Sequence, residues 1–191
     1  MSVVVAQQLF PFVFPVAASG DYVKAYPFGT EVGNQVWGSF WGSDTNVLVP
    51  FFLPPGLFID RIAMNIVSAG SSGSVIRLNA YDMSVTTRRP SSLLAENTID
   101  STSTGTKEAT FTKFAPSNPY RIVFIGAASQ GAPATTPTIA SVGGPGLVGS
   151  TSNNGGNGGY YQSSVSGACP ASFTVSGVYN TLPRMLLRLS A

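Results

Sequence analysis

The sequence contains no histidine and only one cysteine, Cys169, among its 191 residues. Without histidine, Ser-His-Asp and Cys-His nucleophile systems, histidine-ligated metals and histidine-based pH switches are all excluded. A single cysteine cannot form an intrachain disulfide, so the fold must be stable through packing alone. Cys169 stands beside Pro170 among small residues, and we expect a buried small hydrophobic side chain rather than a nucleophile.

Charged residues are also scarce, at 9% of the chain against ~25% in typical proteins. The ten basic and eight acidic residues leave a net charge of +2, and no stretch is basic enough to neutralise a row of phosphates, so we expect no nucleic-acid partner. The 43% of hydrophobic residues supply a core and exclude a wholly disordered chain. Because so little charge keeps copies apart, the composition also predicts an assembly.

The 21 glycines and 14 prolines disfavour long helices, and no 3.6-residue apolar period is sustained. Instead, short segments rich in apolar residues, several with a period of two, are separated by Gly, Pro, Ser, Thr or Asn. We expect strands at 47–53, 61–67, 75–81, 93–99, 108–114, 121–126, 160–165, 172–179 and 184–189. This pattern predicts an all-β protein, a single β-sandwich of the jelly-roll type.

Local features refine three of these expectations. The small-residue loop 68–73 predicts that strands 61–67 and 75–81 form an antiparallel pair. Pro50 cannot donate to a β-ladder, so its strand is expected at a sheet edge or at a bulge. Asp82, at the end of a strand, is expected to cap a turn.

The N-terminal segment 1–20 is predicted to be an extended apolar arm in front of a sandwich domain at 21–191. Residues 1–18 include no basic residue, two glutamines interrupt the apolar run, and two prolines would break a helix, which argues against a signal peptide. The uninterrupted apolar run is also too short to span a membrane, so we expect no membrane insertion. Phe10, Phe12 and Phe14 alternate along the arm and are candidates for docking on a neighbouring subunit.

Two further groups of residues are candidates for binding. The charge-free stretch 126–159 is rich in small residues and is expected to be a long loop, which in a sandwich can carry recognition. Its end supplies the candidate receptor-binding residues, which are Asn153, Asn154, Asn157, Tyr160 and Tyr161; the two tyrosines are equally compatible with ordinary strand positions. Trp37 and Trp41 form an aromatic cluster that fits core packing, a subunit interface or a sugar-stacking platform.

The residues offer little for cofactor chemistry or catalysis. No glycine-rich segment leads into a helix or a P-loop lysine, and no Asp-rich loop has calcium-binding spacing, so we expect no cofactor and no metal. The eight carboxylates are isolated in sequence. Folding could still bring two of them to the separation that a glycosidase needs, which leaves a carbohydrate-active enzyme as an open alternative.

From residue 51 to residue 130 the sequence resembles a recurrent domain at the C-terminal ends of bacteriophage tail fibres and related virion proteins. The matching segments are 54–62 (PPGLFIDRI), 67–78 (VSAGSSGSVIRL), 80–82 (AYD), 90–94 (PSSLL), 99–100 (ID), 104–108 (TGTKE), 120–125 (YRIVFI) and 130–133 (QGAP). The resemblance implies a jelly-roll sandwich that assembles as a homotrimer on a virion, with no enzyme activity.

Three functions follow as expectations. The first is a structural protein of the phage tail or fibre, contacting other virion proteins and binding a host surface glycan through its loops. The second is a capsid decoration, or cement, protein whose arm and Trp37/Trp41 region hold coat subunits. The third is the carbohydrate-active enzyme.

Overall fold

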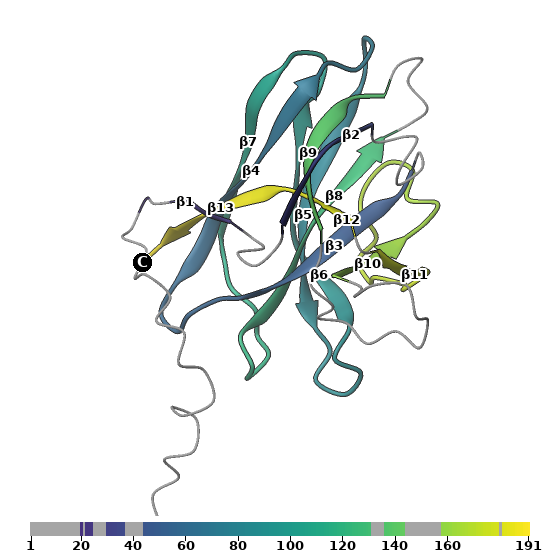
Figure 1. Ribbon diagram of the computed structural model, residues 1–191. Helices are drawn as coiled ribbons and strands as arrows, with labels where there is room; N and C mark the ends of the chain where they lie inside the picture. Colours follow the sequence, from purple (N-terminus) through teal and green to yellow (C-terminus); the bar gives the residue numbers. More distant parts are fainter. Residues whose placement is uncertain are drawn as a thin grey trace, which may run out of the picture.

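The computed structural model describes residues 20, 22–24, 30–36, 44–130, 136–143, 158–179 and 181–191. These residues form strands β1 to β13, and there is no helix among them; consequently no helix in these ranges could cross a bilayer. Every strand pairing is antiparallel, and the strands make two sheets. The predicted all-β sandwich is confirmed (Figure 1).

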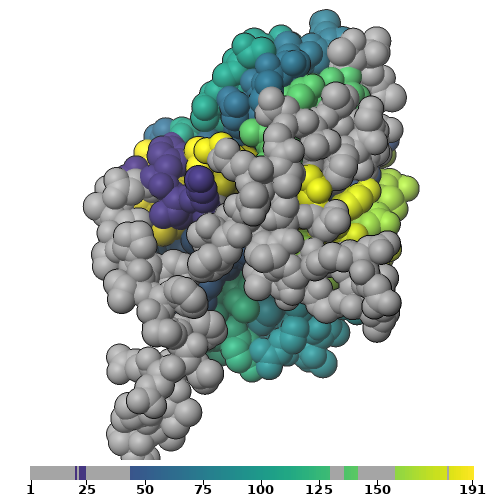
Figure 2. Space-filling model, viewed as in Figure 1, coloured from purple at the N-terminus to yellow at the C-terminus, as the bar shows by residue number. Residues whose placement is uncertain are grey.

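The first sheet has seven strands, and its central path is β1-β13-β4-β9-β12. Strand β7 pairs with β4, and β2 pairs with β9. The bounds are β1 (Tyr22–Lys24), β2 (Thr30–Val36), β4 (Phe58–Ser68), β7 (Gly105–Phe114), β9 (Thr138–Gly143), β12 (Thr181–Pro183) and β13 (Met185–Ser190). In the space-filling view, β1 lies directly beside β13 (Figure 2).

The second sheet has six strands in the order β11-β10-β3-β8-β5-β6. The bounds are β3 (Asn46–Phe52), β5 (Val75–Met83), β6 (Pro90–Asp100), β8 (Ile122–Gln130), β10 (Gly159–Gln162) and β11 (Gly177–Tyr179). Val47 and Val49 of β3 and Ile125 of β8 are fully buried in the main core. On the neighbouring positions, Leu48 and Phe124 belong to a second apolar cluster, so this sheet buries side chains on both faces.

The main core lies between the two sheets and is built by the period-two alternation. Ile62, Met64 and Ile66 of β4 belong to the same buried cluster as Ile76 and Leu78 of β5, and all five are at most 1% exposed. Burial of each such side chain contributes about 1.5–3 kcal/mol. Of the interleaved positions of β4, Asn65 is exposed, Arg61 and Val67 are partly exposed, and the small Ala63 is buried. Alternation therefore identified both the strands and their buried faces.

The predicted pairing of these two strands is wrong. β4 belongs to the first sheet and β5 to the second, so the connection between them crosses from one layer to the other. A strand with one apolar face can bury that face opposite another strand as well as beside it, and alternation does not distinguish the two arrangements. Six residues, 69–74, suffice to cross the ~10 Å that separate packed sheets.

The stretch 126–159, expected to be one long loop, also contains regular structure. β8 continues to Gln130, and β9 forms at Thr138–Gly143 with Ile139 fully buried. The strand expected at 172–179 is instead mostly irregular: Ser172 makes an isolated bridge to Ser92, and only 177–179 form a strand. Strands β1, β2 and β12 were not predicted either.

The irregular segment 163–176, here called the flap, covers part of the outer face of the second sheet. Phe173 of the flap meets Tyr81 of β5 edge to face, with ring centroids 5.3 Å apart, and the Tyr81 hydroxyl donates to the Pro170 carbonyl at 2.8 Å. Cys169 is 5% exposed within the same cluster, which confirms the buried role predicted for it. Burial and hydrogen bonding to Glu96 raise the pKa of its thiol to about 12.

Pro50 lies in β3, which has a neighbouring strand on both sides at its first residues but on only one side at Pro50. β3 pairs with β8 along its whole length, but β10 covers only residues 46–48. The described strands leave the β10 side of β3 open at Pro50, so the proline stands at a locally free edge, as the missing N–H requires.

Candidate functional site: the arginine end

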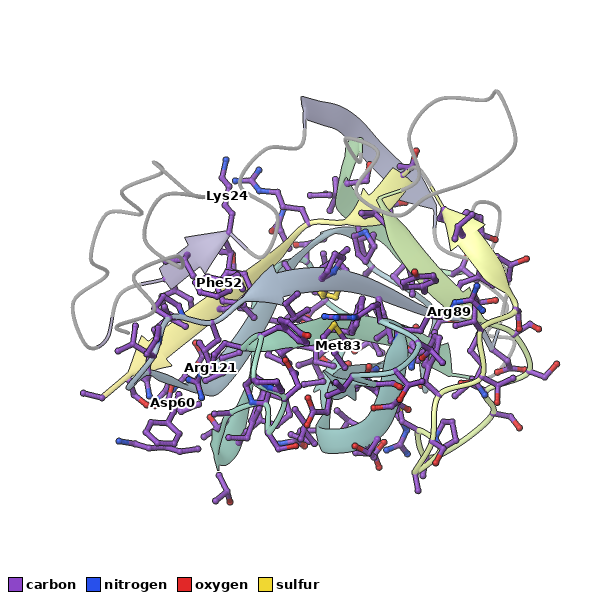
Figure 3. The ribbon with its side chains drawn as sticks, turned by 90° about the horizontal axis from the view of Figure 1, so that it is seen from below. Lys24, Phe52, Asp60, Met83, Arg89 and Arg121 are labelled. Carbon is purple, nitrogen blue, oxygen red and sulfur yellow. The ribbon has the colours of Figure 1, made fainter. Side chains whose placement is uncertain are left out.

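Three connections meet at one end of the sandwich: residues 53–57 between β3 and β4, residues 84–89 between β5 and β6, and residues 115–121 between β7 and β8. We call these connections, with the flanking Phe52 and Phe58, the arginine end. They lie at the bottom of Figure 1, and Figure 3 views the molecule from that side, with Phe52 and Arg121 toward one side, Arg89 toward the other and Met83 between them.

Exposed apolar side chains are concentrated here. In the described parts of the chain, the large apolar residues with more than a third of their surface exposed are Tyr22, Phe52, Phe58, Val85 and Tyr120. All except Tyr22 belong to the arginine end, with exposures of 45% for Phe52, 39% for Phe58, 48% for Val85 and 41% for Tyr120. Apolar exposure gathered in one place indicates a contact surface, whereas isolated exposed residues carry no such meaning.

A buried carboxylate anchors the 115–121 connection to β5. Asp82 is 4% exposed and accepts hydrogen bonds from the Ser117 backbone N–H at 2.9 Å, the Ser117 hydroxyl at 2.6 Å and the Asn118 amide at 2.6 Å. It also accepts from the Met83 N–H at 2.7 Å. Asp82 was predicted to cap a turn at the end of its own strand. Most of its donors instead come from the 115–121 connection, which is distant in the sequence.

Burial alone would raise the pKa of Asp82, but the hydrogen bonds from Ser117, Asn118 and Met83 outweigh it and hold the pKa below its ordinary value of 3.8. Asp82 is therefore ionised at neutral pH. Its hydrogen bonds come from neutral donors beneath the surface, so its direct contacts are with these groups rather than with the exposed arginines.

Arg121 joins the 115–121 connection to the 53–57 connection. Its guanidinium donates to the carbonyls of Leu53, Pro54 and Leu57 at 3.4, 3.2 and 2.9 Å. The Leu53 N–H in turn donates to the Arg121 carbonyl at 2.9 Å. Arg121 therefore fixes the proline-containing turn between Phe52 and Phe58.

Arg88 joins the third connection to the same group. Its guanidinium carbon lies 3.8 Å from the centre of the Tyr120 ring, and Nη2 donates to the Tyr120 hydroxyl at 2.7 Å. A guanidinium stacked on an aromatic ring loses less freedom on binding a carboxylate, because its planar fork is already oriented. Arg89 is exposed beside it.

The backbone is held in left-handed conformations at both arginines that tie the connections together. The φ angles are +59° at Arg88 and +56° at Arg121, and +78° at Gly56 in the turn that Arg121 binds. Residues with a Cβ adopt this region at an energetic cost, and they keep it where surrounding contacts determine the conformation. The arginine end is therefore a built structure rather than three independent loops.

The charge at this end is of one sign. Arg88, Arg89 and Arg121 lie in its connections, and residues 52–58, 84–89 and 115–121 contain no aspartate or glutamate. At the opposite end, the connections 69–74 and 101–104 are joined by a 2.7 Å hydrogen bond between the Ser74 and Ser101 hydroxyls. Those connections are rich in Ser, Thr and Gly and carry no arginine. The two ends of the sandwich thus differ in chemistry.

The residues singled out from the sequence mostly fall outside the described part of the chain: Phe10, Phe12, Phe14, Trp37, Trp41, Asn153, Asn154 and Asn157. Tyr160 and Tyr161 are described, and both are partly buried in β10. Tyr160 packs on Phe124 with centroids 5.7 Å apart, and Tyr161 packs on Tyr179 with centroids 4.5 Å apart. Both tyrosines thus have packing roles within the sandwich.

Several carboxylates that could have served an enzyme have partners elsewhere in the fold. Asp60 binds Arg188, and Glu108 binds Arg61. Glu96 accepts from the Cys169 N–H at 2.7 Å and lies 3.6 Å from an Arg77 nitrogen. The described residues contain no cluster of three potential metal ligands from Cys, Asp and Glu.

A shallow hollow of about 170 Å³ on the first sheet is lined by Asn65, Thr106, Arg184 and Leu186. It is smaller than the roughly 300–1,000 Å³ of typical small-molecule sites. The arginine end remains the better candidate for a contact surface.

A scan against protein-family models gives no match for this sequence, and a search of curated proteins gives none either. The functional argument therefore depends on the residues themselves. The sequence alone does not connect residues 88–90 with Tyr120 or with the two phenylalanines. One signal was present: two of the three connections contain arginines, and none of the three contains an acidic residue.

Proposed function

We propose that the chain is a non-enzymatic structural protein of a bacteriophage virion, a trimeric jelly roll of the tail or tail fibre with a role in binding the host receptor. The observation that carries the proposal is a surface suited to contact: exposed apolar side chains and arginines gathered on a hydrogen-bonded framework at one end of a sandwich. Such a surface supports association, and its described groups are not arranged as a general acid and base.

The placement in a phage particle is supported by the resemblance to tail-fibre domains. The resembling segment 54–62 includes the turn held by Arg121 and the start of β4. Other resembling segments lie in β5, β6, β7 and β8, which extend through both sheets. The resemblance thus follows the sandwich framework rather than a single hairpin.

The direct test is localisation of the chain in purified particles by cryo-electron microscopy. Density at the distal tail supports the proposal. Density on the capsid lattice contradicts it and supports the alternative, a capsid decoration protein. Particles that lack the chain contradict both.

The receptor role is tested separately with the Asn153→Ala/Asn154→Ala/Asn157→Ala variant, and we expect it to reduce adsorption of particles to host cells. Replacing Tyr160 or Tyr161 is a poorer test, because both side chains pack within the sandwich. Unchanged adsorption with unchanged amounts of the chain per particle argues against a receptor-binding role for this loop.

A further inference from the structure

We propose that the arginine end is a docking surface for a different protein, whose contacting face is acidic and also carries apolar side chains. The partner is expected among the other proteins of the particle, and in this respect the inference rests on the proposed function. It goes further by assigning an interface, a partner chemistry and the residues that make the contact.

The first argument is charge complementarity. Arg88 and Arg89 are exposed, and no acidic residue in the three connections offsets them. The nearest carboxylate in sequence, Asp82, is buried under hydrogen bonds from Ser117 and Asn118. A partner that supplies carboxylates at this end would pair with arginines that have no opposing charge in their own connections.

The second argument concerns the kind of molecule that fits. Aromatic residues and arginine are the side chains enriched in the centres of protein interfaces, and here Phe52, Phe58 and Tyr120 accompany the arginines. The one amide side chain of the three connections, Asn118, is buried and committed to Asp82 and Ile122, so it does not face a ligand at the surface. The composition therefore favours a protein face over a glycan.

The third argument excludes a second copy of this chain on the same surface. In a symmetric interface, the arginine end would meet itself and would bring like charges together without carboxylates to separate them. A head-to-tail contact, as in a cyclic trimer, would instead need an acidic face on the neighbouring copy. The described carboxylates Asp60, Glu96 and Glu108 already lie against arginines of their own chain. We therefore assign the complementary face to another protein and the contacts of the proposed trimer to a different surface.

Preorganisation supports the same conclusion. Arg88 is already stacked on Tyr120 and bonded to its hydroxyl, and Arg121 already holds the turn between Phe52 and Phe58. Docking therefore requires little ordering of these groups, which lowers the entropic cost of association. The left-handed φ angles of Arg88 and Arg121 are maintained in the free chain by these contacts.

The experiment replaces Phe58 with the photoreactive amino acid p-benzoylphenylalanine in the full-length chain, expressed from the phage genome during infection. The whole culture is irradiated, so that an adduct forms wherever the chain docks, and the linked peptide is sequenced. Tyr22, an exposed aromatic residue outside the arginine end, receives the same substitution as a matched control. Fractionation of the particles shows separately whether the chain is part of the virion, which tests the proposed function. A failure of the docking proposal can therefore be distinguished from a failure of the proposed function.

We expect the Phe58 probe to link to a segment of another protein with an excess of Asp and Glu, and the Tyr22 probe not to link to that segment. The Arg88→Glu/Arg89→Glu variant should lower the yield of this adduct about tenfold or more. Arg89→Lys, which keeps the charge and leaves the stacked Arg88 in place, should retain most of it. Lys107→Glu, a charge reversal near the opposite end of the sandwich, where Lys107 is paired with Met64 and bonded to Ser103, should leave the yield unchanged.

Three results would overturn the proposal. The first is an adduct confined to a second copy of this chain, to lipid or to a glycan. The second is linkage to a protein segment without acidic residues. The third is an absence of adduct from Phe58, confirmed with the probe at Val85, while circular dichroism and thermal unfolding show that both labelled chains are folded.

Discussion

Asp60 of β4 and Arg188 of β13 are joined by two hydrogen bonds, 2.9 Å from Nε to Oδ1 and 2.6 Å from Nη2 to Oδ2. The pairing is possible because β4 has a bulge: its register with β7 shifts between Ile59 and Arg61, and its register with β13 shifts at the same level. The bulge explains why the apolar residues at this point are spaced by three, Ile59 and Ile62, rather than by two.

The Asp60→Asn substitution should destabilise the sandwich by about 1 kcal/mol, because it removes a charge-assisted bidentate contact that is only partly exposed. Hydrogen bonding to Arg188 holds the pKa of Asp60 below 3.8, so the native state binds protons less readily than the unfolded chain does. The stabilisation is therefore present above pH ~4 and is lost as the pH falls through the lowered native pKa.

Urea unfolding from pH 7 to pH 2.5 measures this effect. The difference between the wild type and Asp60→Asn should shrink at acidic pH. Arg188→Gln should also destabilise the sandwich, and the double variant should cost less than the two single variants together. Strict additivity would show that the two side chains do not interact energetically.

The Asp82→Asn substitution should cost more, about 3 kcal/mol, since the carboxylate is buried and accepts from Ser117, Asn118 and Met83. Ser117→Ala, which removes one of these donors, should cost about 1 kcal/mol. Thermal and chemical unfolding give both values. Because the pKa of Asp82 is lowered in the folded state, this contribution is also lost below pH ~4; a loss of stability equal at pH 7 and pH 3 would argue against the assignment.

The Gly126→Ala substitution should cost about 2–3 kcal/mol through overpacking. A Cβ at this position would lie 2.1 Å from Leu48 Cδ2, 2.7 Å from the Val47 carbonyl oxygen and 2.8 Å from Asn79 Oδ1. Gly73→Ala is the control: its φ is +80° but the space around it is open, so only backbone strain of about 1 kcal/mol applies. Equal losses in the two variants would show that β8 moves to accommodate the methyl group.

Cys169 should be almost unreactive toward thiol reagents in the folded protein. With a thiol pKa of about 12, the thiolate fraction at pH 8 is lower by roughly 10³ than in the unfolded chain, and burial adds to the effect. Labelling with a disulfide reagent in buffer and in urea measures the ratio. Tyr81→Phe, which removes the hydrogen bond to Pro170, should accelerate labelling by loosening the flap; an unchanged rate would mean that this bond does not hold it.

The sequence predicted the strands better than it predicted their partners. Alternation marks β4 and β5 clearly, because a half-buried strand repeats every two residues. Whether Ile62 and Ile76 lie side by side or across the core depends on the path of the 69–74 connection, which small polar residues do not encode. β9 was missed because Ile139, a fully buried residue of this strand, lies in a stretch otherwise rich in small residues.

The arginine end could not have been derived as a site from local sequence. Its defining contacts join Arg88 to Tyr120 and Arg121 to Leu57, pairs that are distant in the chain. Composition indicated that the three connections lack acids, but only the antiparallel topology brings them together.

The placement of β13 determines when the first sheet can fold. β13 lies between β1 and β4, while strands β5 to β12 are all translated between β4 and β13. During synthesis, the edge of β4 that pairs with β13 in the folded protein therefore stays unpaired until β13 has left the ribosome. Such an unpaired edge is a site at which nascent chains can pair with one another until β13 is made.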